Sequence, residues 1–78
     1  MRTAADVRTD PRPGDVVRSG KRFHETDTGH ITEVRRVSQP FRDGTRELRC
    51  LFKGCMFTMS TCQWIEWMSD AELLHVAE

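Results

Sequence analysis

The stretch that decides the fold is TRELRCLFKGCMFTMS, residues 45–60. Only Lys53 and Gly54 separate two β-like runs, and a two-residue turn sets the register of a hairpin. That register places six apolar side chains on one face: Leu48, Cys50, Phe52, Cys55, Phe57 and Met59. The opposite face is mixed, with Glu47, Arg49, Leu51, Met56, Thr58 and Ser60. A turn that by itself yields an apolar face predicts an antiparallel hairpin packed on a core.

The segments before the hairpin predict further short strands. Pro11, Pro13 and Gly14 form a stiff turn, which leads into a strand over residues 15–18. Phe23 begins a second short extended piece. Residues 30–38 (HITEVRRVS) carry an apolar residue at every third position, which suits one helix face, whereas their β-branched content favours a strand. We predict the strand, with a bulge that turns all three apolar residues inward.

The segments after the hairpin predict one short helix and a closing strand. Ser60 or Thr61 caps a helix that carries Trp64 and Met68 on one side, and residues 71–76 form the last strand. The fold class is therefore all-β, mainly β with one short helix, arranged as a small SH3-like barrel or roll of about five strands. The expected core comprises Val16, Ile31, Val34, Val37, Leu48, Cys50, Phe52, Phe57, Met59, Trp64, Leu74 and Val76.

A chain of 78 residues allows one domain. Residues 1–10 are polar and read as a flexible N-terminal lead-in, and residues 11–78 read as the SH3-like β domain. The net charge is zero, yet all 12 basic residues lie at or before Lys53 together with eight acids, which gives +4 there. The remaining residues carry four acids and no Lys or Arg, or −4. This asymmetry predicts either complementary parts of one molecule or a basic binding face.

Two motifs resemble known proteins. The opening PRPGDVVR, residues 11–18, resembles the first strand of small SH3-like modules, including the KOW and Tudor-like groups. That opening, together with a cysteine near a strand end, WIEW (residues 64–67) and AEL (residues 71–73), is similar to small uncharacterised proteins of phages and prophages. The resemblance covers residues 10–76. It implies a bacterial accessory protein that acts through a host protein partner, and it assigns no functional residues.

Two kinds of binding site are candidates for such a module. An arginine-rich β face would bind nucleic acid, because guanidinium groups contact phosphates in pairs of hydrogen bonds; its residues are Arg18, Lys21, Arg22, Arg35, Arg36 and Arg46. A protein partner would instead use an exposed aromatic anchor, for which Trp67 and Phe41 are the candidates. An unpaired strand edge could also pair with a second copy in a homodimer.

Catalytic and metal sites are not expected. Cys50, Cys55 and Cys62 lack the tight spacing of zinc knuckles, although His24, His30 and His75 could complete a set of ligands. Cys62, His75 and Glu66 could form a nucleophile, base and orienting acid only if the fold brought them together. We therefore predict a non-enzyme without a cofactor. An odd number of cysteines, no secretory signal and no long apolar segment predict a cytoplasmic protein that does not enter a membrane.

Overall fold

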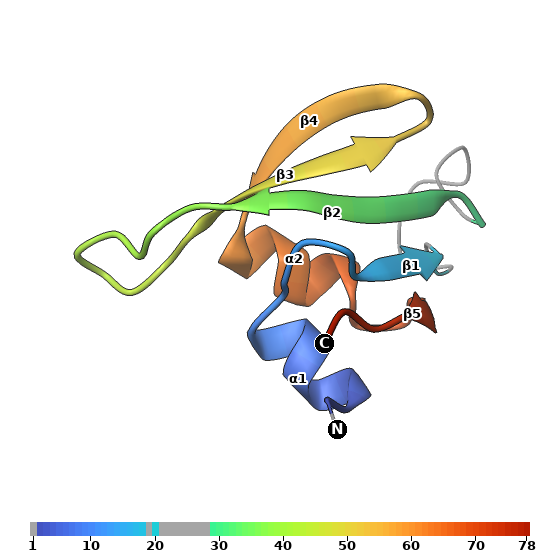
Figure 1. Cartoon of the computed structure of the whole chain (residues 1–78), viewed down its shortest axis with the longest axis horizontal. Coiled ribbons are helices and arrows are strands. Elements are labelled where there is room, and N and C mark those ends of the chain that lie inside the picture. The colour runs from blue at the N-terminus through green and yellow to red at the C-terminus, as the bar shows by residue number, and fades with distance from the viewer. Residues whose placement is uncertain (1, 19, 21–28) are drawn as a thin grey trace.

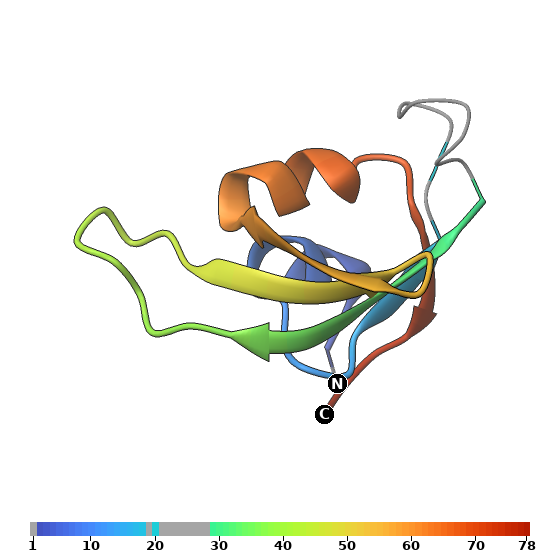
Figure 2. The same cartoon turned by 90° about the horizontal axis from the view of Figure 1, so that it is seen from above.

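The computed structural model describes residues 2–18, 20 and 29–78. The elements are α1 (Ala4–Thr9), β1 (Val16–Arg18), β2 (Ile31–Val37), β3 (Glu47–Phe52), β4 (Cys55–Ser60), α2 (Thr61–Trp67) and β5 (Glu72–His75). The five strands form one antiparallel sheet in the order β4-β3-β2-β1-β5, so that β4 and β5 are its two edges (Figure 1). Helix α2 lies over one face of this sheet (Figure 2). The prediction of a small, mainly β domain with a short helix is confirmed.

The β3–β4 hairpin has the predicted register, with Phe52 opposite Cys55, Cys50 opposite Phe57 and Leu48 opposite Met59. Lys53 and Gly54 form the turn and both have positive φ, at 53° and 76°, as the hairpin turns that match strand twist require. On the predicted apolar face, Leu48, Cys50 and Met59 are buried, Phe52 and Phe57 are half-buried, and Cys55 is exposed at the strand end.

Strand β2 lies within residues 30–38, the segment whose spacing suits a helix and whose composition favours a strand. Its pairing with β3 shifts between Val34 and Arg36, so the strand contains the predicted bulge. The bulge turns Val34 and Val37 toward the core side, but not Ile31, which is 52% exposed. Thr32 takes the inward position instead and is fully buried. The expectation that Ile31 belongs to the core is therefore wrong, because alternation from Val34 back along the strand points residue 31 outward.

Two other core expectations change with the local register. Val17 of β1 is fully buried while Val16 is only half-buried. In β5 a pairing irregularity opposite β1 leaves Leu74 38% exposed, and Leu73 packs against the core in its place. A one-residue change in register moves a side chain to the other face of a sheet, and turn residues alone do not set the register of such short strands.

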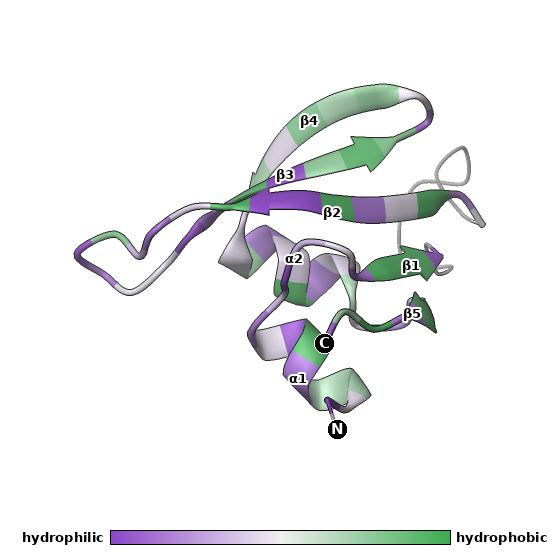
Figure 3. Cartoon of the chain, in the orientation of Figure 1, coloured by the Kyte–Doolittle hydropathy of each residue, from purple (hydrophilic) through white to green (hydrophobic). Residues whose placement is uncertain are grey.

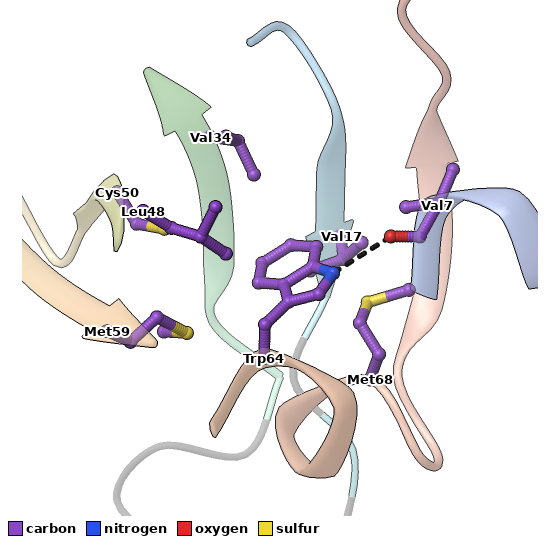
Figure 4. Close-up of a cluster of buried hydrophobic side chains, with 8 residues drawn as sticks. All are labelled: Val7, Val17, Val34, Leu48, Cys50, Met59, Trp64 and Met68. Carbon is purple, nitrogen blue, oxygen red and sulfur yellow. Dashed lines mark hydrogen bonds between the residues drawn. The ribbon is translucent and has the colours of Figure 1, made fainter. Parts of the chain in front are cut away.

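The core lies between the sheet and the two helices (Figure 4). Trp64 of α2 is its largest fully buried side chain, and its indole Nε1 donates a hydrogen bond of 2.9 Å to the carbonyl oxygen of Val7 in α1. The cluster consists of Val7, Val17, Val34, Leu48, Cys50, Met59, Trp64 and Met68. Of the two predicted cap residues, Ser60 and Thr61, it is Ser60 that caps α2, in a reciprocal capping box with Gln63.

Residues 1–10, for which the sequence predicts a flexible lead-in, contain α1 instead. Thr3 and Asp6 form a capping box at its start, and Val7 is fully buried against the core. The polar composition of this segment gives no apolar helix pattern, because Val7 is the one side chain of α1 that is buried in the core. Residues 21–28, which include Phe23 and its predicted extended piece, lie outside the described part of the chain.

A buried ion pair holds the two ends of the chain together. The guanidinium of Arg2 donates to both carboxylate oxygens of Asp15, at 2.7 and 2.9 Å, and to the carbonyl oxygen of Ala77 at 2.7 Å. The backbone N–H groups of Arg12 and Ala77 also donate to Asp15, each at 2.8 Å. Burial raises the pKa of this carboxyl, but these hydrogen bonds outweigh it and hold the pKa below its ordinary value.

Candidate functional site

Two of the four described residues of the predicted arginine face form ion pairs with neighbouring acids. Arg18 lies 3.6 Å from Glu72 of β5, and Arg35 lies 3.0 Å from Glu33 of the same strand. Both arginine side chains are about half exposed, so these surface pairs contribute little stability, but they do lower the local positive charge. Lys21 and Arg22 lie outside the described residues.

Arg36, like Arg46, is a residue of the predicted face that has no ion pair with a described residue. It lies directly opposite Arg49 in the β2–β3 pairing, and neither side chain has an ion pair with a described residue. Arg46 is separate from this pair. Its carbonyl oxygen accepts a hydrogen bond from the Thr61 backbone N–H, at the start of α2. The six predicted residues therefore do not form one continuous basic surface among those that the structure describes.

Trp67 does not project from the surface as an anchor. Its indole Nε1 donates to the hydroxyl of Thr32 at 3.2 Å, and its ring lies edge-on to Phe52, with centroids 5.3 Å apart. Phe57 of β4 lies 6.4 Å from the same indole. The half-buried Trp67 therefore forms the wall of a recess rather than a protruding side chain.

That recess is an open groove of about 280 Å³ between the edge strand β4 and helix α2. We call it the β4–α2 groove, and it is lined by Phe57, Thr58, Met59, Gln63, Glu66 and Trp67. Its apolar residues come mainly from the sheet side and Trp67, whereas α2 adds the polar Gln63 and Glu66. Its volume is slightly below the usual range of small-molecule pockets, which supports a site for a large side chain.

Phe41 lies in the loop between β2 and β3, which extends away from the body of the molecule in both views (Figures 1 and 2). Its side chain is 54% exposed. It borders a second hollow of about 150 Å³, the loop hollow, whose lining is Phe41, Arg46, Glu47, Thr58, Met59, Ser60 and Gln63. Thr58, Met59 and Gln63 line both hollows. The two predicted anchors thus border one surface along β4.

This surface is charged differently at its two ends. Glu66 lies at the end near Trp67, is exposed and has no ion pair with a described residue. Arg46 lies at the other end, beside Phe41, where the oppositely charged Glu47 lines the same hollow. A ligand that spans both hollows would gain from a basic group near Glu66.

The three thiols occupy different environments. Cys50 is buried, and burial raises the pKa of its thiol to about 11, whereas Cys55 and Cys62 are exposed. Within residues 2–18, 20 and 29–78, no group of three or more His, Cys, Asp or Glu side chains could hold a metal ion. His24 of the alternative zinc set lies outside the described residues. Cys62 lies in the first turn of α2, which directly follows β4, while His75 lies on β5 at the opposite edge of the sheet.

No family model, curated protein or solved structure matches this chain. In the portion of the chain that the structure describes, none of the helices is long and apolar enough to span a bilayer.

Sequence reasoning found Trp67 and Phe41 but missed the residues that join them. Met59 and Phe57 were predicted as core because they lie on the apolar face of the hairpin. The strand order places β4 at an edge of the sheet, and this position exposes the outer part of the apolar face. No pattern within the sequence of β4 indicates that it is an edge strand. One feature of the sequence could have drawn attention to Gln63: it follows the helix cap Ser60 by three residues, which is the position of the second capping-box residue.

Proposed function

We propose that this chain is a non-enzymatic binding module that holds a segment of a partner protein along β4. The observation that carries the proposal is that Thr58, Met59 and Gln63 line both hollows, which joins Trp67 to Phe41 in one surface. Aromatic side chains beside well-packed recesses are the usual centres of binding energy in protein interfaces.

The bound segment places a large apolar side chain in the β4–α2 groove. A basic side chain beside it faces Glu66, whereas Arg46 and Glu47 balance each other's charge at the other end. The charge of Glu66 selects the direction of the segment more than it adds affinity, because this side chain is exposed on the rim of the surface.

The strand order supports the finer proposal of an SH3-like barrel or roll. Five antiparallel strands follow one another in the sheet, and the first strand pairs with the last after a single short helix. Together with the resemblance of residues 10–76 to phage and prophage proteins, this supports an accessory protein of phage origin. Its partner would then be a host protein in the bacterial cytoplasm.

A photoreactive amino acid at Gln63, introduced into the full chain in bacterial cells, tests this proposal. We expect a cross-linked adduct that Phe41→Ser and Glu66→Lys each reduce severalfold. Ile31→Ser is the matched control, because Ile31 is as exposed as Phe41 but lies away from the surface. The identified partner is then titrated against the purified variants. The proposal is overturned if position 63 gives no adduct, or if the same probe at the exposed Ile65 gives the same adduct.

Nucleic-acid binding is a second candidate function, favoured by one observation. Arg36 and Arg49 are directly opposed, although like charges in that position destabilise a sheet. A phosphate between the two guanidinium groups would remove the repulsion. Binding of a short single strand that weakens steeply as salt rises, and is lost in Arg36→Gln and Arg49→Gln, would favour this function over the first.

A further inference from the structure

The two edges of the sheet differ in how they are protected from pairing with another chain. Strand β5 is short, carries Glu72 and His75, and pairs irregularly with β1. Strand β4 is longer, reads CMFTMS and has neither a charged residue nor a proline. In Figure 3 no strongly hydrophilic colour appears along β4. Charges, prolines and bulges are the usual devices that keep an edge strand unpaired, and β4 has none of them.

The hairpin turn determines which backbone groups of β4 face the open edge. Phe52 and Cys55 flank a two-residue turn and therefore form a hydrogen-bonded pair. Bonded and non-bonded pairs alternate along an antiparallel ladder, so the N–H and C=O groups of Met56, Thr58 and Ser60 point away from β3. The Ser60 N–H already donates to the side chain of Gln63 at 2.8 Å. Met56 and Thr58 retain both of their groups for another strand.

These four groups are self-complementary under two-fold symmetry. In an antiparallel pairing of two β4 strands, Met56 lies opposite Thr58 of the second copy and each such pair exchanges two hydrogen bonds. Phe57 then lies opposite Phe57 of the second copy, and the core faces of both sheets lie on the same side. The alternative register centred on Thr58 would need the Ser60 N–H group, which Gln63 already occupies. The chain has zero net charge, so two copies do not repel one another overall.

We infer that two copies of this chain pair through β4 in this register and form one continuous ten-strand sheet. The second copy also contributes to the proposed partner site, an extension that rests on the proposed function. Its Phe57 lies beside the open side of the β4–α2 groove, and its Cys55 lies opposite Met59. Each groove thereby gains a third wall.

Two double variants that share Thr58→Glu test the pairing. The new glutamate faces Arg49 within its own sheet, so both variants keep a favourable intrachain neighbour. In M56E/T58E, each pair across the axis brings two glutamates together. In M56K/T58E, each pair brings a lysine and a glutamate together. Both positions are exposed on the outer face, so the core is unchanged.

Sedimentation equilibrium with reducing agent present measures the dimer dissociation constant of each protein, and circular dichroism verifies that each is folded. We expect wild type and M56K/T58E to dimerise, and M56E/T58E to dissociate at least about tenfold more readily. A wild type that is monomeric at about 100 μM, or two double variants with equal dissociation constants, would overturn the inference. Sedimentation detects a second copy of this chain, whereas the cross-link from position 63 detects a different protein, so failure of the dimer and failure of the partner site are distinguishable.

Discussion

At the scale of single residues, Trp64 connects three parts of the molecule. It is on α2, it packs against sheet residues such as Val17 and Val34, and its indole N–H satisfies the carbonyl of Val7 in α1 (Figure 4). A buried carbonyl without a donor costs more than the net gain from an ordinary hydrogen bond. Trp64 therefore supplies both apolar area and the polar contact that lets α1 dock.

We predict that Trp64→Phe lowers the free energy of unfolding by about 2–4 kcal/mol, because it leaves a cavity and an unpaired Val7 carbonyl. Urea denaturation followed by circular dichroism measures the loss. Trp67→Phe is the control, since Trp67 is half-buried and its indole N–H donates to the Thr32 hydroxyl and not to a backbone carbonyl. An equal loss in the two variants would contradict the special role of Trp64.

At the scale of elements, the β3–β4 hairpin is the part of the fold whose geometry is set most directly by neighbouring residues. Its turn residues adopt the left-handed region, and its register presents Leu48, Cys50 and Met59 to the core. The same register determines which backbone groups of β4 face the open edge. The turn thus sets both the packing of the hairpin and the geometry of the proposed interface.

Gly54→Ala tests the turn without a steric complication, because a Cβ at Gly54 would meet nothing within 4 Å. We expect a loss of about 1–2 kcal/mol in the free energy of unfolding, since a side chain disfavours the positive φ of this position. Lys53→Asn should act in the opposite direction by about 0.5 kcal/mol, because Asn tolerates the left-handed region better than Lys. Thermal melts of both variants measure these shifts, and a stabilising Gly54→Ala would refute the assigned turn.

At the scale of the whole molecule, the Arg2–Asp15 pair joins the N-terminal segment, the entry to β1 and the C-terminal residues. Removing one partner of a buried pair leaves an unsatisfied buried charge, which usually costs about 3–5 kcal/mol. Because the pKa of Asp15 is lowered in the folded state, the folded protein binds fewer protons there than the unfolded chain does. Its contribution is complete above the ordinary pKa of about 3.9 and decreases as pH falls toward the folded value.

Asp15→Asn should therefore destabilise the protein by about 3–5 kcal/mol at pH 7. Below pH 4 the difference between variant and wild type should shrink, since wild-type Asp15 becomes protonated as well. Urea titrations at a series of pH values measure this difference, and the comparison cancels the other carboxyl groups. A gap that stays constant down to pH 2 would show that Asp15 stabilises the fold by packing and not by its charge.

The sequence by itself determined the local structure wherever neighbouring residues set the geometry. The two-residue turn set the register of residues 45–60. The spacing of Ile31, Val34 and Val37 predicted a bulge, although Ile31 points outward, and Ser60 or Thr61 marked the start of α2. It also identified Trp67 and Phe41 as candidate anchors. The turn, the bulge and the helix start each depend on contacts between residues close in the chain, where the backbone alone constrains which side chains meet.

Only the tertiary structure decided which strands are edges, which face of each three- or four-residue strand is buried, and whether residues 2–9 fold. Val7 and Trp64 meet across 57 positions of sequence, and Arg2 reaches Ala77 across 75. The two hollows lie where α2 and the β2–β3 loop meet β4, which the strand order places at an edge of the sheet. Contacts of this kind are favourable only after the whole core has assembled, so no local pattern in the sequence reports them.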